Sequence, residues 1–462
     1  MPLILPGNVA SATAGGYDVA NSVRMNDGDS PYFAKTPSAG DRAKWTFSVW
    51  FKIGINPTDS QNIFTCGAAA NNTDQSTIKL EGGTIDWWEY DRSETAFDGR
   101  LTTNRLIRDP SAWYHLVCTW DTDNGTAGNR MRMYINGTEE TSFSTDNNPS
   151  SGYDSAINSN ELHEIGRASW NSAGHFDGYF AEMAFCDGQA YAASDFGEFD
   201  EDSPAIWKPK DISGLTFGSR GWYLDFEDSG DLDDDESGNG NDWTAANLAA
   251  ADQSTDTPTN NFATLNPLIE WYPGYTSTFS EGNLDVTRSD NGAGHSTIMV
   301  SSGKWYAEFK AITVGSGGNE IGAVSYELTL NAWLASNKGV AYTSAGNKVI
   351  DGTSSSYGDS YAANDIISIA LNLDDGECTF YKNGTAQDSG TAISGFSTAS
   401  VFAILGGGFG STWKWSANFG TPSPSITISS GNADANGYGN FEYAVPSGYY
   451  ALCTKNLGEF GG

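Results

Sequence analysis

Apolar and polar residues alternate along several short runs of this chain. In the run 44–53 every second residue from Trp45 to Ile53 is apolar, and the run 304–311 repeats the pattern from Trp305 to Ala311. A period of two places successive side chains on opposite faces of a strand, so these runs predict strands with one buried face. Long stretches with the 3.6-residue period of a helix are missing, and one or two turns near 190–196 are the only helix candidate. The pattern therefore predicts an all-β protein.

Each half of the chain holds an Asn-Gly pair after a strand-like run. The sequences are Tyr-Ile-Asn-Gly-Thr at 134–138 and Tyr-Lys-Asn-Gly-Thr at 381–385. Asn and Gly supply the two positive φ angles of a type I′ turn, so both segments are predicted as tight β-hairpins. One copy in each half predicts two β-sandwich domains, of a kind that mostly binds other molecules.

The charge of the chain limits its partners. The 462 residues include 58 acidic and 24 basic side chains, which give a net charge of −34. Such a surface repels phosphate backbones and anionic lipid headgroups, which excludes electrostatic binding to nucleic acid or to anionic membranes. The carboxylates suit Ca²⁺ sites, although solubility alone explains the charge equally well.

Cysteine usage and the first residues bear on where the chain is made. The five cysteines lack CxxC or metal-ligand spacing, and their odd number favours buried free thiols over a disulfide framework. The segment 1–16 has no basic region, and prolines interrupt its apolar run, so neither a signal peptide nor membrane insertion is expected. These features predict synthesis in a reducing cytoplasm, with 1–16 as a docking segment.

Two families resemble the two halves. From Ser22 to Tyr191 the chain resembles a laminin-G-like domain of the concanavalin-A-like jelly-roll superfamily, through SVRMNDGDSPYFAKT, WTFSVWFKI, WYHLVCTWD, MRMYINGTEE and LHEIGRASWNSAGHFDGYFAEMAF in that order. From about Phe279 to Leu457 it resembles a SPRY-type sandwich, through SSGKWYAEF, IGAVS, DIISIALNLDDGECTFYKNGT, ANFG and PSGYYAL. Both resemblances imply a two-sheet jelly roll, in agreement with the alternation and the turns.

The composition changes between the two resemblances. The stretch 197–268 contains prolines and the acidic run DFEDSGDLDDDESGNGNDW, so we expect an acidic, partly extended connector, part of which packs on a domain. The expected order is a docking segment (1–16), a laminin-G-like sandwich (17–196), the connector (197–268), a SPRY-type sandwich (269–457) and a tail (458–462).

The two domains and their connector together resemble virion-associated proteins of marine tailed phages. This resemblance implies a non-enzymatic tail fibre, appendage or decoration protein on the virion surface, in contact with other virion proteins, that recognises a host-surface glycan or protein. An appendage role also implies a homo-oligomer, such as a trimer. The alternative is an architectural protein that packs on capsid or tail and has no soluble ligand.

The sequence shows few residue patterns that are typical of an enzyme. A polysaccharide-degrading retaining glycosidase needs two carboxylates about 5–5.5 Å apart. Asp177 and Glu182 are five residues apart, which places them on opposite faces of one strand. The four histidines show no metal-ligand spacing. We therefore expect a binding protein.

The acidic run is the strongest metal candidate. Its oxygen-bearing side chains follow the 1, 3, 5, 9 and 12 spacing of an EF-hand calcium loop, at Asp231, Asp233, Asp235, Asn239 and Asp242. The sequence departs from that loop at position 6, where Glu236 replaces the glycine of the sharp turn. A solvated acidic loop is the alternative interpretation.

Aromatic residues beside polar ones are the candidates for glycan binding, because sugars present apolar C–H faces rimmed by hydroxyl groups. The consecutive Trp87 and Trp88 cannot both face the core if they lie on a strand. The candidates are Trp87, Trp88, Tyr90 and Asp91; Trp170, Asn171 and His175; and, in the second half, Trp333, Tyr357, Trp413 and Trp415. The alternative is that these rings pack in a core or a subunit interface.

Overall fold

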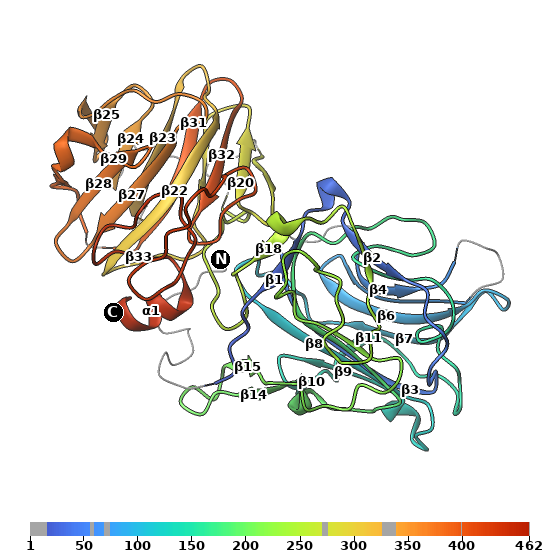
Figure 1. The fold of residues 1–462 in the computed structure, drawn as a ribbon. Coiled ribbons are helices and arrows are strands. Elements are labelled where there is room, and N and C mark those ends of the chain that lie inside the picture. The colour runs from blue at the N-terminus through green and yellow to red at the C-terminus, as the bar shows by residue number, and fades with distance from the viewer. Residues whose placement is uncertain are drawn as a thin grey trace. The chain divides into compact units, whose positions relative to one another are not determined.

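The computed structural model describes residues 16–55, 60–68, 74–269, 276–325, 339–398 and 400–461. Strands dominate it, which confirms the predicted all-β class (Figure 1). The chain forms two compact units that divide between Thr259 and Asn260. The described α-helix, α1 (Thr454–Phe460), and the 3₁₀ turns are short, and none could cross a membrane. The 3₁₀ turns are Asp27–Asp29, Ala127–Asn129, Ala193–Asp195, Ala250–Asp252 and Gln387–Gly390.

The first unit is a sandwich of two antiparallel sheets. The first sheet has the order β10-β9-β8-β3-β13-β1-β18, and β16 also pairs with β13. Its strands are β1 (Ser22–Met25), β3 (Lys44–Ile53), β8 (Tyr114–Asp121), β9 (Met131–Ile135), β10 (Thr138–Glu139), β13 (Gly178–Asp187), β16 (Trp222–Leu224) and β18 (Gln253–Ser254). The second sheet has the order β11-β7-β6-β5-β4-β12-β2-β17. Its strands are β2 (Tyr32–Lys35), β4 (Gln61–Cys66), β5 (Gln75–Glu81), β6 (Thr84–Asp91), β7 (Ala96–Thr103), β11 (Phe143–Asn147), β12 (His163–Ile165) and β17 (Thr244–Ala246).

The core of this sandwich contains the apolar residues of the alternating runs. Trp45 and Phe47 of β3 are fully buried between the sheets, and Trp45 stacks on Trp120 of β8 with ring centroids 5.9 Å apart. The five cysteines are buried free thiols, as the sequence predicts. The alternation thus marks the buried face of these strands correctly.

The stretch expected as a connector contributes strands to this first sandwich. β16 pairs with β13, β17 with β2 and β18 with β1. A buried ion pair holds the end of the stretch, because Lys52 Nζ lies 2.7 Å from Asp256 Oδ2, and Trp113 Nε1 donates to the other carboxylate oxygen. The extended backbone between the turns thus finds partners at the edges of both sheets.

A two-stranded strap covers the outer face of the first sheet. It consists of β14 (Gly197–Phe199) and β15 (Trp207–Pro209). Trp207 stacks on the buried His115 of β8, and its Nε1–H donates to His115 Nδ1 over 2.9 Å. Val117, Tyr134 and Ala184 complete the apolar cluster under the strap.

The second unit is another two-sheet sandwich (Figure 1). One sheet has the order β19-β20-β32-β22-β27-β28-β29, with β30 on β28 and β33 on β22. Its strands are β19 (Thr278–Ser280), β20 (Asp285–Arg288), β22 (Lys304–Thr313), β27 (Ile366–Asn372), β28 (Glu377–Lys382), β29 (Thr385–Ala386), β30 (Ile393–Ser394), β32 (Trp413–Asn418) and β33 (Tyr450–Ala451). The other sheet has the order β21-β31-β23-β24-β25-β26. Its strands are β21 (Gly292–His295), β23 (Gly318–Ser325), β24 (Gly339–Thr343), β25 (Asn347–Ile350), β26 (Thr353–Ser356) and β31 (Phe402–Phe409).

Both Asn-Gly pairs form the predicted turns. Asn136 and Gly137 have φ of 48° and 76° between β9 and β10, and Asn383 and Gly384 have φ of 48° and 77° between β28 and β29. Two consecutive positive φ angles define the type I′ hairpin. The repeated motif therefore has the same backbone shape in both sandwiches.

Candidate functional site

The consecutive tryptophans of β6 separate onto the two faces of the second sheet. Trp87 points into the core, where it is 0 % exposed, and lies 5.6 Å from Trp45 between ring centroids. Trp88 points outward and is half-buried. Trp87 is thus a core residue and not a ligand-binding residue, while Trp88 lies on the outer face as the pattern requires.

Four rings form a continuous aromatic face on the outside of this sheet. They are Trp88 and Tyr90 of β6, Phe97 of β7 and Trp170 of a loop. Ring centroids are 5.5 Å apart for Trp88 and Trp170, 5.6 Å for Trp88 and Phe97, and 5.1 Å for Tyr90 and Phe97. Phe97 is 40 % exposed, so the face presents aromatic surface to solvent. In contrast to the strap-covered first sheet, this outer face carries solvent-accessible rings.

Hydrogen bonds hold the loop that carries Trp170. The hydroxyl of Thr65 on β4 donates to Arg167 O over 2.9 Å and accepts from Ser169 N over 3.1 Å. The Ser169 hydroxyl donates in turn to Gly67 O over 2.8 Å. Trp170 therefore reaches Trp88 from a loop fixed to the sheet.

Arg100 of β7 supports the aromatic face with its charge already balanced. Its Nε and Nη2 donate to the two carboxylate oxygens of Asp86 over 2.9 and 3.0 Å. Its guanidinium lies 4.8 Å from the centroid of the Phe97 ring. Bidentate pairing fixes the guanidinium plane, so Arg100 orients Phe97 and contributes little free positive charge.

Two carboxylates lie at the end of β6 and the start of β7. Asp91 accepts hydrogen bonds from Ser93 and from the backbone of Glu94 in the β6–β7 turn, and these bonds lower its pKa. The hydroxyl of Tyr153 donates to Asp98 over 3.0 Å, and desolvation by burial raises the pKa of Asp98. The carboxylate on the outer face itself is Asp86, which binds Arg100.

Sequence reasoning missed Phe97 and Arg100. Both belong to β7, whose residues reach the face through their register with β6: Trp88 pairs with Arg100 and Tyr90 with Phe97. The register shifts between Glu89 and Tyr90, which brings Phe97 beside Tyr90. The alternation of 96–103 is the only signal in the sequence, and it does not specify this register.

The remaining candidates are dispersed. Asn171 is exposed and its side chain accepts from Ala173 N, and His175 is half-buried in the same loop.

Trp413 and Trp415 are 0 % exposed and belong to the second core, so they are not ligand-binding residues. Their indole N–H groups donate to Asp290 O and Gly407 O. Proximity to turns is misleading here, because alternation along β32 turns both rings inward. Tyr357 is also a core residue, packed on Tyr342 and Phe380, and Trp333 lies outside the described residues.

The acidic run uses its oxygens within the chain. Asp235 accepts from the backbone N–H groups of Tyr223, Ser237 and Asn241. Asp233 accepts from Ala245 N, and Asp242 from Asp235 N. The side-chain amide of Asn239 donates to the carbonyls of Gly218 and Gly221. The hydrogen bond with Asp233 raises the pKa of the exposed Asp231.

These contacts do not fit a calcium cage, because the oxygens that would face the ion accept hydrogen bonds from backbone N–H groups instead. Among the residues that the structure describes, no group of three or more His, Cys, Asp or Glu side chains is placed to hold a metal.

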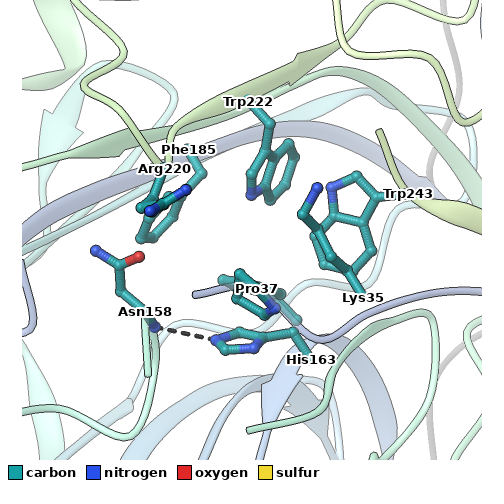
Figure 2. Close-up of a pocket in the computed structure, with 9 residues that line it drawn as sticks. Lys35, Pro37, Asn158, His163, Phe185, Arg220, Trp222 and Trp243 are labelled. Atoms are coloured by element: carbon teal, nitrogen blue, oxygen red, sulfur yellow. Dashed lines mark hydrogen bonds between the residues drawn. The ribbon is translucent and has the colours of Figure 1, made fainter. Parts of the chain in front are cut away.

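A small pocket lies in the first sandwich, lined by residues of both sheets (Figure 2). Aromatic residues and two cations line it: Phe64, Phe185, Trp222 and Trp243 with Pro37, and Lys35 and Arg220, besides Asn158 and His163. It encloses about 10 Å³, close to the space that one water molecule needs. A sugar therefore does not fit inside it.

Two family models match parts of the chain. The model of the concanavalin A-like lectin/glucanases superfamily matches residues 27–193, and the SPRY domain model matches residues 304–421. The chain thus contains a concanavalin A-like domain followed by a SPRY domain. Domains of these two kinds fit carbohydrate or protein binding, and no enzyme family is indicated.

Solved structures similar to parts of the chain include the SPRY domain of human HERC1, 17% identical, with a TM-score of 0.26 over 31% of this chain and 91% of that one. They also include a heptameric SAP-like pentraxin from Limulus polyphemus, 16% identical, with a TM-score of 0.29 over 38% of this chain and 80% of that one. No curated protein matches the chain.

Proposed function

We propose that this protein is a non-enzymatic binding protein of a virion surface, and that the aromatic face of its concanavalin A-like domain recognises a glycan. The observation that carries the proposal is the row of Trp170, Trp88, Phe97 and Tyr90 on the outer face of the second sheet. A monomer gains nothing from holding these rings partly in solvent, whereas the C–H face of a sugar would cover them.

The charges around the face favour an uncharged glycan. The nearest strand cation, Arg100, is already paired with Asp86. The turn between β6 and β7 adds Arg92 but also Asp91 and Glu94. A sialylated, uronic or sulfated chain would meet more carboxylates than free cations there, and this repulsion disfavours its binding.

The virion context rests on the resemblance of the two-domain arrangement and on the free cysteines. In this proposal other virion proteins anchor the chain, the host surface presents the glycan, and several copies assemble, for example as a trimer. An array of copies would multiply a weak affinity for each site. This proposal assigns no residues to a calcium ion. The binding test therefore includes a chelator, which would reveal any dependence on calcium.

The first prediction concerns the two tryptophans. We expect Trp88→Ala and Trp170→Ala to weaken binding to a neutral oligosaccharide about tenfold or more each, because each removes a central ring of the face. Binding is measured on a panel of neutral and acidic oligosaccharides and on intact bacterial cells, with and without chelator. Phe199→Ala is the matched control, since it removes an exposed ring, 45 % exposed, from the strap.

A folded wild-type protein that binds no member of the panel would contradict the proposal and favour the architectural role. In that case the Trp88→Ala variant should instead change the oligomeric state measured by light scattering, because the face would be a subunit interface.

A further inference from the structure

The pocket of Figure 2 brings two cations together in an acidic chain, and within the described part of the chain neither forms an ion pair with a carboxylate. Lys35 donates from Nζ to the main-chain oxygen of Asp242 over 2.8 Å. No ion pair among the described residues includes Lys35 or Arg220, although most other lysines and arginines of this unit form one. Burial lowers the pKa of Lys35, and repulsion by Arg220 adds to this, while the charges of Asp235 and Asp242 act in the opposite direction.

The carboxylates nearest to these cations already accept other hydrogen bonds. Asp235 and Asp242 accept from backbone N–H groups of the acidic run. Asp187 accepts from Asn158 Nδ2 over 2.7 Å and from the backbone N–H of Arg220 over 3.1 Å. Their charges reduce the positive potential, but none of them pairs with the ammonium or guanidinium group.

The pocket also contains a buried donor without an acceptor. Trp243 is 5 % exposed, and its Nε1–H has no hydrogen-bond partner among the residues that the structure describes. Leaving a buried N–H without an acceptor is unfavourable, which favours a ligand that can accept from it. Figure 2 shows Lys35 and Trp243 on one side of the pocket and Arg220 on the other. The Trp222 ring meets Trp243 nearly edge to face, with centroids 5.0 Å apart.

The histidine of the pocket adds no charge. His163 Nε2 accepts from Asn158 N over 3.0 Å, so its proton lies on Nδ1, which donates to Glu161 O. Burial lowers the pKa of His163 to about 4, so the ring is neutral at pH 7. The groups that could bind a ligand are therefore the indole N–H and two cations, beside one acceptor, the side-chain oxygen of Asn158, whose amide nitrogen donates to Asp41 O and Asp187 Oδ1.

We propose that this pocket binds a compact inorganic anion, chloride, between Arg220, Lys35 and the indole N–H of Trp243. Chloride accepts hydrogen bonds from all three groups, and the positive edges of aromatic rings suit an anion. The volume of about 10 Å³ excludes sulfate or a sugar acid, so a monatomic anion is the ligand that suits these donors. The ion would join β2 to the stretch 220–243, which comes from a distant part of the chain.

The test compares chloride with methanesulfonate, an anion too large for the pocket, at equal ionic strength. We expect chloride to broaden the ³⁵Cl NMR line in a saturable way that bromide competes away. We also expect it to raise the melting temperature of the first unit by about 2–4 °C when it exceeds its dissociation constant about fivefold. Methanesulfonate should produce neither effect.

Three variants connect the effect to the pocket. Arg220→Gln should abolish the chloride-specific shift, and Trp243→Phe, which keeps the ring and removes the N–H, should reduce it. Lys210→Gln is the matched control, because Lys210 also donates to a main-chain oxygen but lies outside the pocket. Absence of chloride-specific broadening in the wild type would overturn the proposal, whether or not the variants fold. Undiminished broadening in Trp243→Phe and Arg220→Gln would overturn it as well.

Discussion

Glu182 is a carboxylic acid that the fold holds in a buried, left-handed position of β13. Its φ is 47°, at the point where the register of β13 with β3 shifts, and the side chain is 5 % exposed. Tyr223 and Tyr17 donate hydrogen bonds to it over 2.7 and 3.2 Å. Desolvation by burial raises its pKa to about 8 despite these bonds, so Glu182 is protonated at neutral pH.

This raised pKa predicts a pH-dependent effect of Glu182→Gln. Because the native state binds the proton more tightly than the unfolded chain, the wild type loses stability as the pH rises from about 4.5 to about 8. The amide does not ionise, so we expect the variant to gain on the order of a few kcal/mol relative to the wild type between pH 5 and pH 9. Denaturant unfolding at both pH values measures the difference.

The exposed Glu139→Gln serves as the control for this comparison. An equal stability difference between wild type and Glu182→Gln at pH 5 and pH 9 would contradict the assignment of a buried neutral acid.

Side-chain direction along one strand can be predicted from sequence, but cross-strand neighbours cannot. The pair Trp87 and Trp88 had to separate between core and surface, and it does. Trp413 and Trp415 are two residues apart, so they share one face of β32, and that face lies in the core. Lys414 between them is on the other face, where it pairs with Asp285. Phe97 reaches the aromatic face only because β7 pairs with β6 through a register shift, and local sequence does not encode that shift.

At the scale of elements, the β9–β10 hairpin and the strap depend on one glycine. A Cβ on Gly137 would lie 2.2 Å from the Trp207 ring, whereas a Cβ on Gly152, which has a similar positive φ, would meet nothing within 4 Å. We expect Gly137→Ala to destabilise the first unit by about 2–4 kcal/mol, and Gly152→Ala by about 1–2 kcal/mol. The difference between these two destabilisation energies, measured by denaturant unfolding, reports the displacement of the strap. Equal costs would show that Trp207 moves freely.

The strands of the acidic stretch show where prediction from composition ends. β16, β17 and β18 have three, three and two residues, too few for an alternating pattern to appear. All three strands bond through their backbone to sheet edges, which any sequence without proline can do, and β16 also places Trp222 and Leu224 in the core. Prolines and carboxylates therefore predict an extended stretch but not its partners.

At the scale of the molecule, the two compact units predict a boundary for separate folding. We expect a fragment of residues 16–259 to melt cooperatively, and a fragment of residues 16–196 to lack a cooperative transition. The shorter fragment removes Trp222, Leu224 and Trp243 from the core. It also leaves Lys52 buried without Asp256, which costs about 3–5 kcal/mol. Calorimetry of both fragments tests this, and a cooperative transition in 16–196 would contradict it.

The pairing of β1 with β18 decides how the first unit responds to tension. Ser22 lies opposite Ser254, so the chain enters and leaves the sandwich at the same end of one antiparallel pair. A force applied to both ends separates this pair one hydrogen bond at a time, instead of shearing all of its bonds together. The resistance then comes from the contacts at that end, where Ser22 donates to Asp256 O and Asp256 binds Lys52. Under tension we expect these contacts of Ser22, Asp256 and Lys52 to break before the other strand pairs of the two sheets separate.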